Sequence, residues 1–419
     1  MEEKKNVPKR RFGEFVKERG WKSEYFENLA EIVRGASPRP IQDPKWFDKN
    51  SQVGWLRISD VTEQNGRIRY LEQHISELGQ KKTRVIHTPH LLLSIAATVG
   101  KPVINYTSTG VHDGFLIFYE PKFDIEYMYY WLEKFRPEWS KYGQPGSQVN
   151  LNSELVKTQK VYLPSKSEQL KIKKFFQHLD KLIDVHQQKL QKLKAQKQAY
   201  LSEMFPQEGE TKPKRRFAGF EGSWQIIKFN DLLNATEGIR RGPFGSALKK
   251  EFFVNDSQYV VYEQHNAIYN TFQTRYKISK DKYNELIKFR VSEGDFIMSG
   301  AGTIGKIARV PKDIQNGVIN QALIRIKIDA SIIDPNYFIQ WMRADEMQNR
   351  LTHSNPGSAM VNLVPMTELK NWEVLLPSLE EQQKIGTFFQ KLDSLIEKQE
   401  ERVKKYQALK QAYLNEMFV

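Results

Sequence analysis

The strongest constraint on the fold is an internal duplication, because much of the first half of the chain recurs in the second half. The matched pairs keep the same order: PKRRF at 8–12 and 213–217, Trp21 and Trp224, SIAATVGK at 94–101 with SGAGTIGK at 299–306, and PGS at 145–147 and 356–358. A collinear series of this kind indicates a structural unit that occurs twice. The fold must therefore accommodate two similar units in one polypeptide.

The longest match closes each half. Residues 163–205 align with 376–418 without a gap, and each stretch carries apolar residues at alternating spacings of three and four. The expected packing positions are Ile172, Phe176, Leu179, Ile183, Leu190 and Leu193 in the first copy and Ile385, Phe389, Leu392, Ile396, Val403 and Tyr406 in the second. This heptad pattern predicts two long helices, each about 57 Å long for about 38 residues.

A helix with a sustained apolar seam needs a partner, and each copy supplies one. The sequence therefore predicts that the two helices pack as an antiparallel coiled coil related by a pseudo-twofold axis. Four polar residues interrupt the seam: His186, Gln399, Lys197 and Lys410. Such residues set register and orientation at some cost in stability, although His186 is equally compatible with a solvated edge position.

The regions before each helix read as mixed α+β domains. Short strands with turns are expected at 53–61, 90–100 and 115–121 in the first copy, strands at 257–264, 294–300 and 321–328 in the second, and helices at 127–135 and 335–343. The predicted organisation is an N-terminal arm (1–20), a first domain (21–164), a central long helix (165–206), a linker (207–223), a second domain (224–377) and a C-terminal long helix (378–419). The fold class is α+β.

The two domains diverge most at residues 34–90 and 237–295. A shared frame with different inserts indicates one scaffold that recognises two different things. Neutral drift of surface loops is the alternative explanation.

Charge and composition point to a polyanionic partner. The chain has 64 Lys and Arg against 50 Asp and Glu, a net charge of +14, which suits a nucleic-acid binder; a basic protein without such a partner is the alternative. There is no cysteine, no apolar leader and no apolar run long enough to span a bilayer. We therefore expect a soluble, cytoplasmic protein without a membrane association.

The sequence lacks recognisable catalytic chemistry. The segment 300–306 fits G-x-x-x-x-G-K, but Ile307 follows where a phosphate-binding loop requires Ser or Thr, and Ser94 replaces the leading glycine in the first copy. We interpret both segments as turns. The eight histidines do not cluster at metal-ligand spacing, and no zinc-protease, hydrolase or adenine-methyltransferase motif occurs. The sequence predicts no catalytic residue and no metal site.

The duplicated helix-start motif resembles the specificity (S) subunit of type I restriction–modification enzymes. The matching residues are Leu163-Pro164-Ser165, Glu168-Gln169, Ile172, Leu179-Asp180 and Ile183, and then Leu376-Pro377-Ser378, Glu381-Gln382, Ile385, Leu392-Asp393 and Ile396. The segments 94–101 and 299–306 and the PGS segments are also similar to that family, and 242–249 looks like a common target-recognition type.

The resemblance implies two target-recognition domains on an antiparallel helical pair, each reading one half of a bipartite target in double-stranded DNA. Two methyltransferase (M) subunits and, in a complete system, restriction (R) subunits are the implied partners. S-adenosylmethionine, ATP and magnesium would belong to those partners, so no cofactor is expected in this non-catalytic chain. A stand-alone DNA-binding regulator, a coiled-coil scaffold, and a nuclease or methyltransferase fused into one chain are the competing hypotheses.

Basic loops in the divergent segments are the candidate DNA contacts. They contain Arg34, Ser37, Arg39 and Lys45 in the first domain and Arg240, Arg241, Ser246, Lys249 and Lys250 in the second. Arginine can read guanine edges with two hydrogen bonds, whereas lysine mostly holds phosphate.

Overall fold

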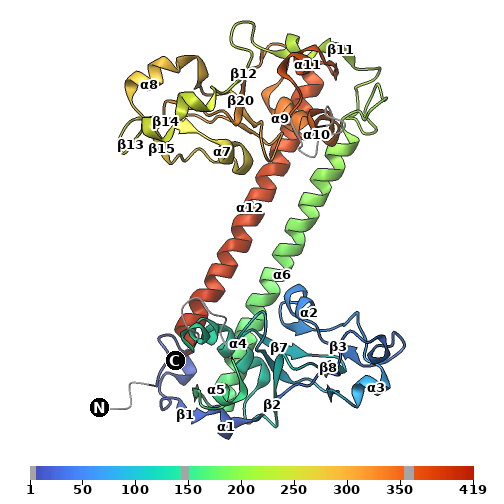
Figure 1. Ribbon diagram of the computed structural model, residues 1–419, viewed down its shortest axis with the longest axis vertical. Helices are drawn as coiled ribbons and strands as arrows, with labels where there is room; N and C mark the ends of the chain where they lie inside the picture. Colours follow the sequence, from blue (N-terminus) through green and yellow to red (C-terminus); the bar gives the residue numbers. More distant parts are fainter. Residues whose placement is uncertain (1–5, 143–150, 353–362) are drawn as a thin grey trace. The chain divides into compact units, whose positions relative to one another are not determined.

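The computed structural model describes residues 6–142, 151–352 and 363–419 (Figure 1). The chain divides into two compact units: the first comprises Met1–Gln187 and Glu401–Val419, and the second Gln188–Glu400. Each unit combines a globular α+β part with a portion of each long helix. The PGS segments at 145–147 and 356–358 lie outside the described residues.

The first unit is built on a five-stranded sheet with a smaller sheet beside it. The large sheet has the order β2 (Glu31–Arg34), β9 (Phe115–Tyr119), β6 (Leu91–Ser94), β7 (Pro102–Asn105) and β4 (Arg67–Ile68). The small sheet has the order β3 (Gly54–Trp55), β8 (Thr109–Val111) and β5 (Arg84–Ile86), and a separate pair joins β1 (Lys22–Tyr25) to β10 (Lys160–Leu163). The helices are α1 (Phe26–Leu29), α2 (Ile58–Glu63), α3 (Glu77–Gln80), α4 (Ile125–Phe135) and α5 (Ser153–Lys157), with 3-10 turns η1 (Gly13–Phe15), η2 (Pro44–Trp46) and η3 (Arg136–Tyr142).

The second unit has a four-stranded and a five-stranded sheet. The first has the order β12 (Ile239–Arg241), β20 (Leu323–Ile326), β17 (Phe296–Ser299) and β18 (Ile307–Arg309). The second has the order β13 (Phe253–Val254), β15 (Tyr276–Ile278), β14 (Tyr259–Tyr262), β19 (Gly317–Ile319) and β16 (Arg290–Val291), and β11 (Gln225–Lys228) pairs with β21 (Glu373–Leu376). The helices are α7 (Gln264–Tyr269), α8 (Lys280–Glu285), α9 (Pro335–Arg343), α10 (Asp345–Thr352) and α11 (Met366–Asn371), with 3-10 turns η4 (Phe229–Leu232), η5 (Gly245–Leu248), η6 (Lys250–Phe252) and η7 (Ile287–Phe289).

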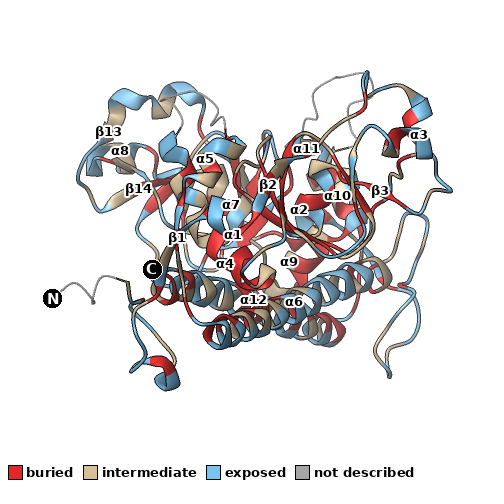
Figure 2. Ribbon diagram, turned by 90° about the horizontal axis from the view of Figure 1, so that it is seen from below, coloured by how far each residue is buried: buried red, intermediate tan, exposed pale blue. Residues whose placement is uncertain are grey.

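The two units repeat one core plan. The strand order β2-β9-β6-β7 in the first matches β12-β20-β17-β18 in the second, and all of these neighbours are antiparallel. The helices α4 and α9 that follow are largely buried (Figure 2). Asp124 caps α4 and Asp334 caps α9, each accepting two backbone N–H groups of the first turn. The predicted α+β fold with an internal duplication is confirmed.

One predicted strand is partly wrong. Residues 53–61 were expected to be extended, but only β3 is a strand, and α2 begins at Ile58. Asp60 accounts for the difference, because its carboxylate accepts the backbone N–H of Arg57 at 2.8 Å and so caps the start of α2. The capping interaction outweighs the β-propensity of the surrounding Val and Ile residues.

Both long helices are present and pack against each other. Helix α6 spans Lys166–Glu203 and α12 spans Leu379–Met417. In the first unit Phe175 lies against Tyr413 with ring centroids 4.9 Å apart, and in the second Tyr200 lies against Phe388 at 5.0 Å. Because residue numbers rise in α6 as they fall in α12, the helices are antiparallel, as predicted.

The seam is most tightly packed where it meets each globular part. Ile172, Phe176 and Leu179 share a core with residues of α4, and Ile385 and Phe389 share one with residues of α9. Ile183, Leu392 and Val403 are also buried, whereas Leu190, Leu193, Ile396 and Tyr406 are intermediate. The seam residues nearest the domains thus fasten the helices to the domains as well as to each other.

Lys197, Lys410 and His186 of the seam have partners on the opposite helix. Lys197 Nζ lies 2.6 Å from Asp393 Oδ1 in the second unit, and Lys410 pairs with Asp180 in the first. His186 stacks on Tyr406 with ring centroids 5.1 Å apart. Gln399 is buried.

Within the described part of the chain, none of the helices combines the length and apolar character needed to cross a membrane.

Candidate nucleic-acid interface

The two glycine-containing turns are structural elements of the sheets. In the first unit Gly100 has φ +76° and donates its N–H to the Ser94 carbonyl at 2.8 Å. In the second, Gly305 has φ +78° and donates to the Ser299 carbonyl at 2.9 Å. Each serine thereby closes the turn between two neighbouring strands, which supports the interpretation of these segments as turns and not as phosphate-binding loops.

The first candidate loop follows strand β2, and we call residues 35–45 the Gly35 loop. Gly35 donates its N–H to the carbonyl of Phe115 at 2.8 Å. A Cβ atom at Gly35 would lie 2.1 Å from the carbonyl oxygen of His112, so only glycine fits here. The loop is consequently pressed against the turn that connects β8 to β9.

Asp113, in that turn, organises the Gly35 loop. Its carboxylate accepts hydrogen bonds from Ser37 Oγ and from Arg39 Nη2, each at 2.7 Å, and its carbonyl accepts Arg34 Nε at 2.7 Å. The hydrogen bond from Ser37, with the nearby positive charges of Arg39 and Arg34, lowers the pKa of the Asp113 carboxyl. The Arg39 side chain is nevertheless 71% exposed, so the loop presents a positioned guanidinium to solvent.

Lys45, at the end of the same loop, is partly neutralised. Its Nζ lies 2.7 Å from Asp43 Oδ2 and 4.6 Å from the centre of the Trp46 ring. The structure therefore brings Arg34, Ser37 and Arg39 together around one aspartate and leaves Lys45 outside that group.

The second candidate loop follows strand β12, and we call residues 242–250 the Gly242 loop. Gly242 donates its N–H to the carbonyl of Leu323 at 2.9 Å, and a Cβ there would lie 1.8 Å from the Asn320 carbonyl oxygen. Gly35 and Gly242 thus occupy the same place, at the end of an outer strand and against the turn before β9 or β20.

The cations around the Gly242 loop are largely uncompensated. Among the described residues, the side chains of Arg240, Arg241 and Lys250 form neither an ion pair nor a hydrogen bond, and Lys249 Nζ lies 3.7 Å from a Glu251 oxygen. Ser246 is exposed. The loop therefore presents positive charge without the anchoring carboxylate that Asp113 supplies in the first unit.

A buried charge cluster supports the start of β12. Arg325, only 1% exposed, donates to the carbonyls of Arg290 at 2.9 Å and Glu237 at 3.2 Å. The Glu237 carboxylate accepts hydrogen bonds from Lys327 and Arg290. The hydrogen bond from Lys327 and the positive charge of Arg325 lower the pKa of Glu237. This cluster fixes the strand from which the Gly242 loop emerges.

Sequence reasoning missed Asp113, Glu237 and Arg325, which carry or support the two loops. It also missed Phe244, which is 89% exposed within the Gly242 loop. An arginine in the middle of the apolar pattern at 321–328 is the one visible signal, since a buried strand position should be apolar.

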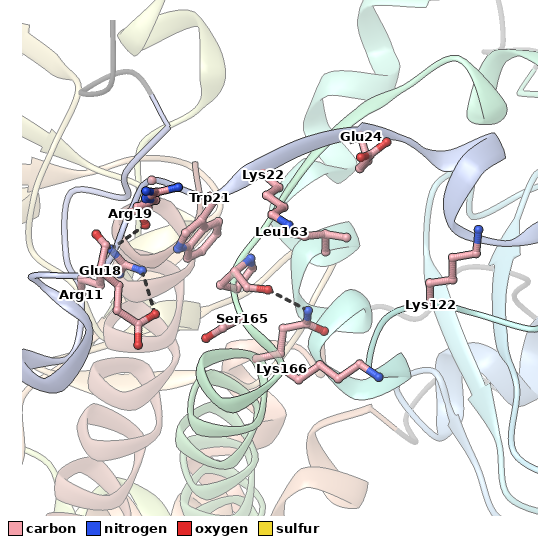
Figure 3. A pocket seen from close by; sticks show the side chains of 13 residues that line it. Arg11, Glu18, Arg19, Trp21, Lys22, Glu24, Lys122, Leu163, Ser165 and Lys166 are labelled. Atoms are coloured by element: carbon pink, nitrogen blue, oxygen red, sulfur yellow. Dashed lines mark hydrogen bonds and ion pairs between the residues drawn. The ribbon is translucent and has the colours of Figure 1, made fainter. Parts of the chain in front are cut away.

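The N-terminal arm binds the start of α6, beside a cleft of about 430 Å³ (Figure 3). Arg11 lies 2.7 Å from Glu168 through both Nε and Nη2, and it also donates to the carbonyls of Glu18 and Arg19. Arg216 makes the same two-pronged contact with Glu381 in the second unit. These repeated arginines are engaged in holding the fold together, so we do not include them in the candidate interface.

Within residues 6–142, 151–352 and 363–419, no three or more His, Asp or Glu side chains are grouped so that they could hold a metal ion.

Comparison with known proteins agrees with the duplicated plan. The family model described as type I restriction modification DNA specificity domain matches residues 18–195 and 221–405. The type I restriction enzyme EcoBI specificity subunit of Escherichia coli is 36% identical over 109 residues, which are 26% of this chain and 23% of that relative. The chain therefore aligns with about a quarter of the length of this relative.

Two solved structures share the fold over nearly the whole chain. The S subunit of a type I restriction–modification system from M. genitalium has a TM-score of 0.59 and 11% identity, covering 99% of each chain. A chain from a structure of type I restriction–modification complex assembly and conformational transition has a TM-score of 0.58 and 14% identity, covering 95% of this chain and 97% of that one. With the duplicated units and the two family matches, these findings show that the chain belongs to the family of type I restriction–modification DNA specificity domains, of which it carries two copies.

Proposed function

We propose that this chain is the DNA-specificity subunit of a type I restriction–modification system and that each globular domain reads one half of a bipartite, asymmetric target. One observation carries the proposal: the Gly35 and Gly242 loops occupy the same place on two copies of one scaffold but present different chemistry. Two readers that differ in this way would recognise two different half-sites, so the whole target would not be a palindrome.

The chain itself would be non-catalytic. Two methyltransferase subunits would dock on it, and restriction subunits would complete the nuclease, with S-adenosylmethionine, ATP and magnesium bound by those partners. Exposed apolar side chains on the long helices support docking, because burying apolar surface against a partner is energetically favourable. These are Leu170, Val185, Leu395 and Leu409, which are 42%, 52%, 54% and 37% exposed.

The long helices would set the spacer between the half-sites. Helix α6 is continuous over 38 residues, from the first unit into the second. A heptad inserted in register into both helices would lengthen the pair by about 10 Å, which corresponds to about three base pairs at about 3.4 Å each. The methylated sequence should then keep its two halves and gain a longer spacer, less whatever the helices absorb by bending.

The experiment that tests the proposal is a domain exchange. Residues 21–164 are replaced by the corresponding domain of a homologue, and the methylated sequence of the host genome is mapped with each version of the gene. One half of the methylated motif should change while the half read by residues 224–377 stays fixed, because distant, independent sites contribute additively. Two altered halves, or none, would contradict the two-reader proposal.

A second measurement addresses DNA binding directly. The affinity of the assembled complex for its target should fall steeply as salt increases, because Lys and Arg contacts with phosphate release counterions. An affinity that does not change with salt would count against the proposed interface. Tight, specific binding by the purified chain without a methyltransferase would instead favour a stand-alone regulator.

A further inference from the structure

Phe244 has an apolar side chain whose exposed position does not contribute to the folding of the protein. It is 89% exposed, although the loop that carries it is packed against the body of the second unit. Its neighbour Pro243 is buried, and Ala247 and Leu248 pack against a hydrophobic core. The chain thus buries the apolar residues on either side of Phe244 and turns this one outward.

The backbone around Phe244 is held in place. Gly242 lies so close to the Asn320 carbonyl that a Cβ would clash, and the proline ring of Pro243 fixes its φ angle. The carbonyl of Phe244 accepts the N–H of Ala247 at 2.9 Å, closing the turn that leads into η5. The loop is therefore already ordered in the free protein. Binding a partner through this ring does not have to order the backbone, which favours high affinity.

The surroundings of Phe244 specify the partner. Arg241, Lys249 and Lys250 are exposed nearby in the sequence, and Arg241 and Lys250 have no ion-pair partner among the described residues. An apolar ring among uncompensated cations suits a ligand with a polyanionic backbone and apolar surfaces between its charges. Duplex DNA has both, in its phosphates and in its bases.

We propose that Phe244 is a specificity-determining residue whose ring contacts the bases of the half-site read by the second domain. The inference rests on the proposed function and deepens it. The equivalent loop of the first domain presents Arg39, held by Asp113, so the first reader uses a hydrogen-bond donor where the second uses an apolar ring. The ring contacts either the methyl group of a thymine or the face of a base at an opened step, and both are apolar surfaces of the bases.

The test uses the complete complex of this chain with its methyltransferase. Mapping of methylated bases in cells first defines the target of the wild-type complex. Equilibrium binding is then measured on a duplex with this target and on a duplex of equal length in which the half-site of the second domain is scrambled. The variants are Phe244→Ala, Phe244→Leu and, as the control for loss of an exposed apolar side chain, Ile226→Ala on β11, where Ile226 is 67% exposed.

We expect Phe244→Ala to lower the affinity for the target about tenfold, as loss of a base contact does, and to leave the affinity for the scrambled duplex unchanged. Phe244→Leu should retain part of the affinity, and Ile226→Ala all of it. Replacing thymine by uracil in the second half-site distinguishes the two base surfaces. If uracil lowers the affinity of the wild-type complex but not that of Phe244→Ala, the ring contacts the thymine methyl. If uracil leaves the affinity of the wild-type complex unchanged, the ring contacts the face of a base.

Three results would overturn the inference. Phe244→Ala could bind both duplexes like wild type, could lose affinity equally for both, or could fail to co-purify with the methyltransferase, which would assign the ring to a protein contact. A wild-type complex that does not distinguish the two duplexes would overturn the proposed function itself.

Discussion

Lys410 of α12 is paired with Asp180 of α6, and Lys197 of α6 is paired with Asp393 of α12, so one interhelical contact occurs in both units with the helices exchanged. Each aspartate also accepts a hydrogen bond from the domain helix of its own unit, through Tyr130 Oη in α4 at 2.7 Å or Gln340 Nε2 in α9 at 2.8 Å. Each carboxylate therefore joins three helices at one point.

We expect Asp180→Ala to lower the free energy of unfolding by about 3 kcal/mol, because it leaves the partly buried Lys410 without its partner. Chemical denaturation measures the change. Asp184→Ala is the matched control one turn further along α6, where burial and the charge of Asp180 raise the pKa of the carboxyl, so its removal should not destabilise the protein. A double-mutant cycle should show coupling of Asp180 to Lys410 and none to Lys197.

Phe176 should be more critical to the packing of the long helices α6 and α12 than its place in the heptad alone would indicate. Its ring stacks on Tyr130 with centroids 5.0 Å apart and on Phe418 at 5.7 Å. Phe176→Ala should lower the free energy of unfolding by about 4 kcal/mol, measured by thermal or chemical unfolding. Val185→Ala, at an exposed position of the same helix, should cost little.

Charged residues at Phe176 and Phe389 together should disrupt the packing of α6 against α12 and abolish methylation by the complex. Methylation mapping and co-purification with the methyltransferase check this outcome. If methylation and co-purification with the methyltransferase both persist in this variant, the seam does not hold the complex together.

The two equivalent glycines should respond differently to alanine. At Gly100, with φ +76°, a Cβ would lie 2.3 Å from the ring of Trp139, which is buried and cannot move aside. At Gly305, with φ +78°, the Cβ would lie 2.8 Å from the end of the Gln348 side chain. This side chain can rotate away, but it then loses its hydrogen bonds to the carbonyls of Gly305 and Met342. Both variants should be destabilised by backbone strain of about 1 kcal/mol, and Gly100→Ala should lose more stability than Gly305→Ala because of the clash with Trp139. Equal melting temperatures for the two variants would contradict this account.

Acid should weaken the charge cluster at Glu237. The folded protein lowers the pKa of this carboxyl below its ordinary value of 4.5, chiefly through the hydrogen bond from Lys327. A lowered carboxyl pKa contributes stability that is present above pH 4.5 and is lost as the pH falls through the folded value. Glu237→Gln should therefore lose less stability than wild type between pH 6 and pH 3. Parallel urea titrations at several pH values give the comparison, and identical pH profiles would exclude this role for Glu237.

The parts of the fold that depend on pattern could be predicted from sequence. The duplication follows from collinear matches, and the long helices follow from heptads whose members, such as Ile172 and Ile385, proved to be buried. Strands β9 and β20 were visible because they are short apolar runs bounded by turns.

The parts that depend on contacts between distant residues could not be predicted. Asp113 lies 76 residues from Ser37, and only the fold shows that it holds the Gly35 loop. The interhelical partners of Lys197 and Lys410 depend on the register of the coiled coil, which the heptad pattern alone leaves open. The exposure of Phe244 depends on how the Gly242 loop packs against the rest of the second unit, which is likewise a tertiary effect.

Each of the repeated PKRRF segments binds the C-terminal end of one long helix. Arg10 donates its N–H to the carbonyl of Glu416 near the end of α12 at 2.9 Å, and Arg215 donates to that of Glu203 at the end of α6 at 2.8 Å. The arm before the first domain therefore joins α12 in the way that the linker joins α6. Each of these contacts lies within one unit, so neither depends on which of the two repeats comes first in the sequence. A gene in which the two repeats were exchanged would therefore encode a protein with the same two backbone contacts.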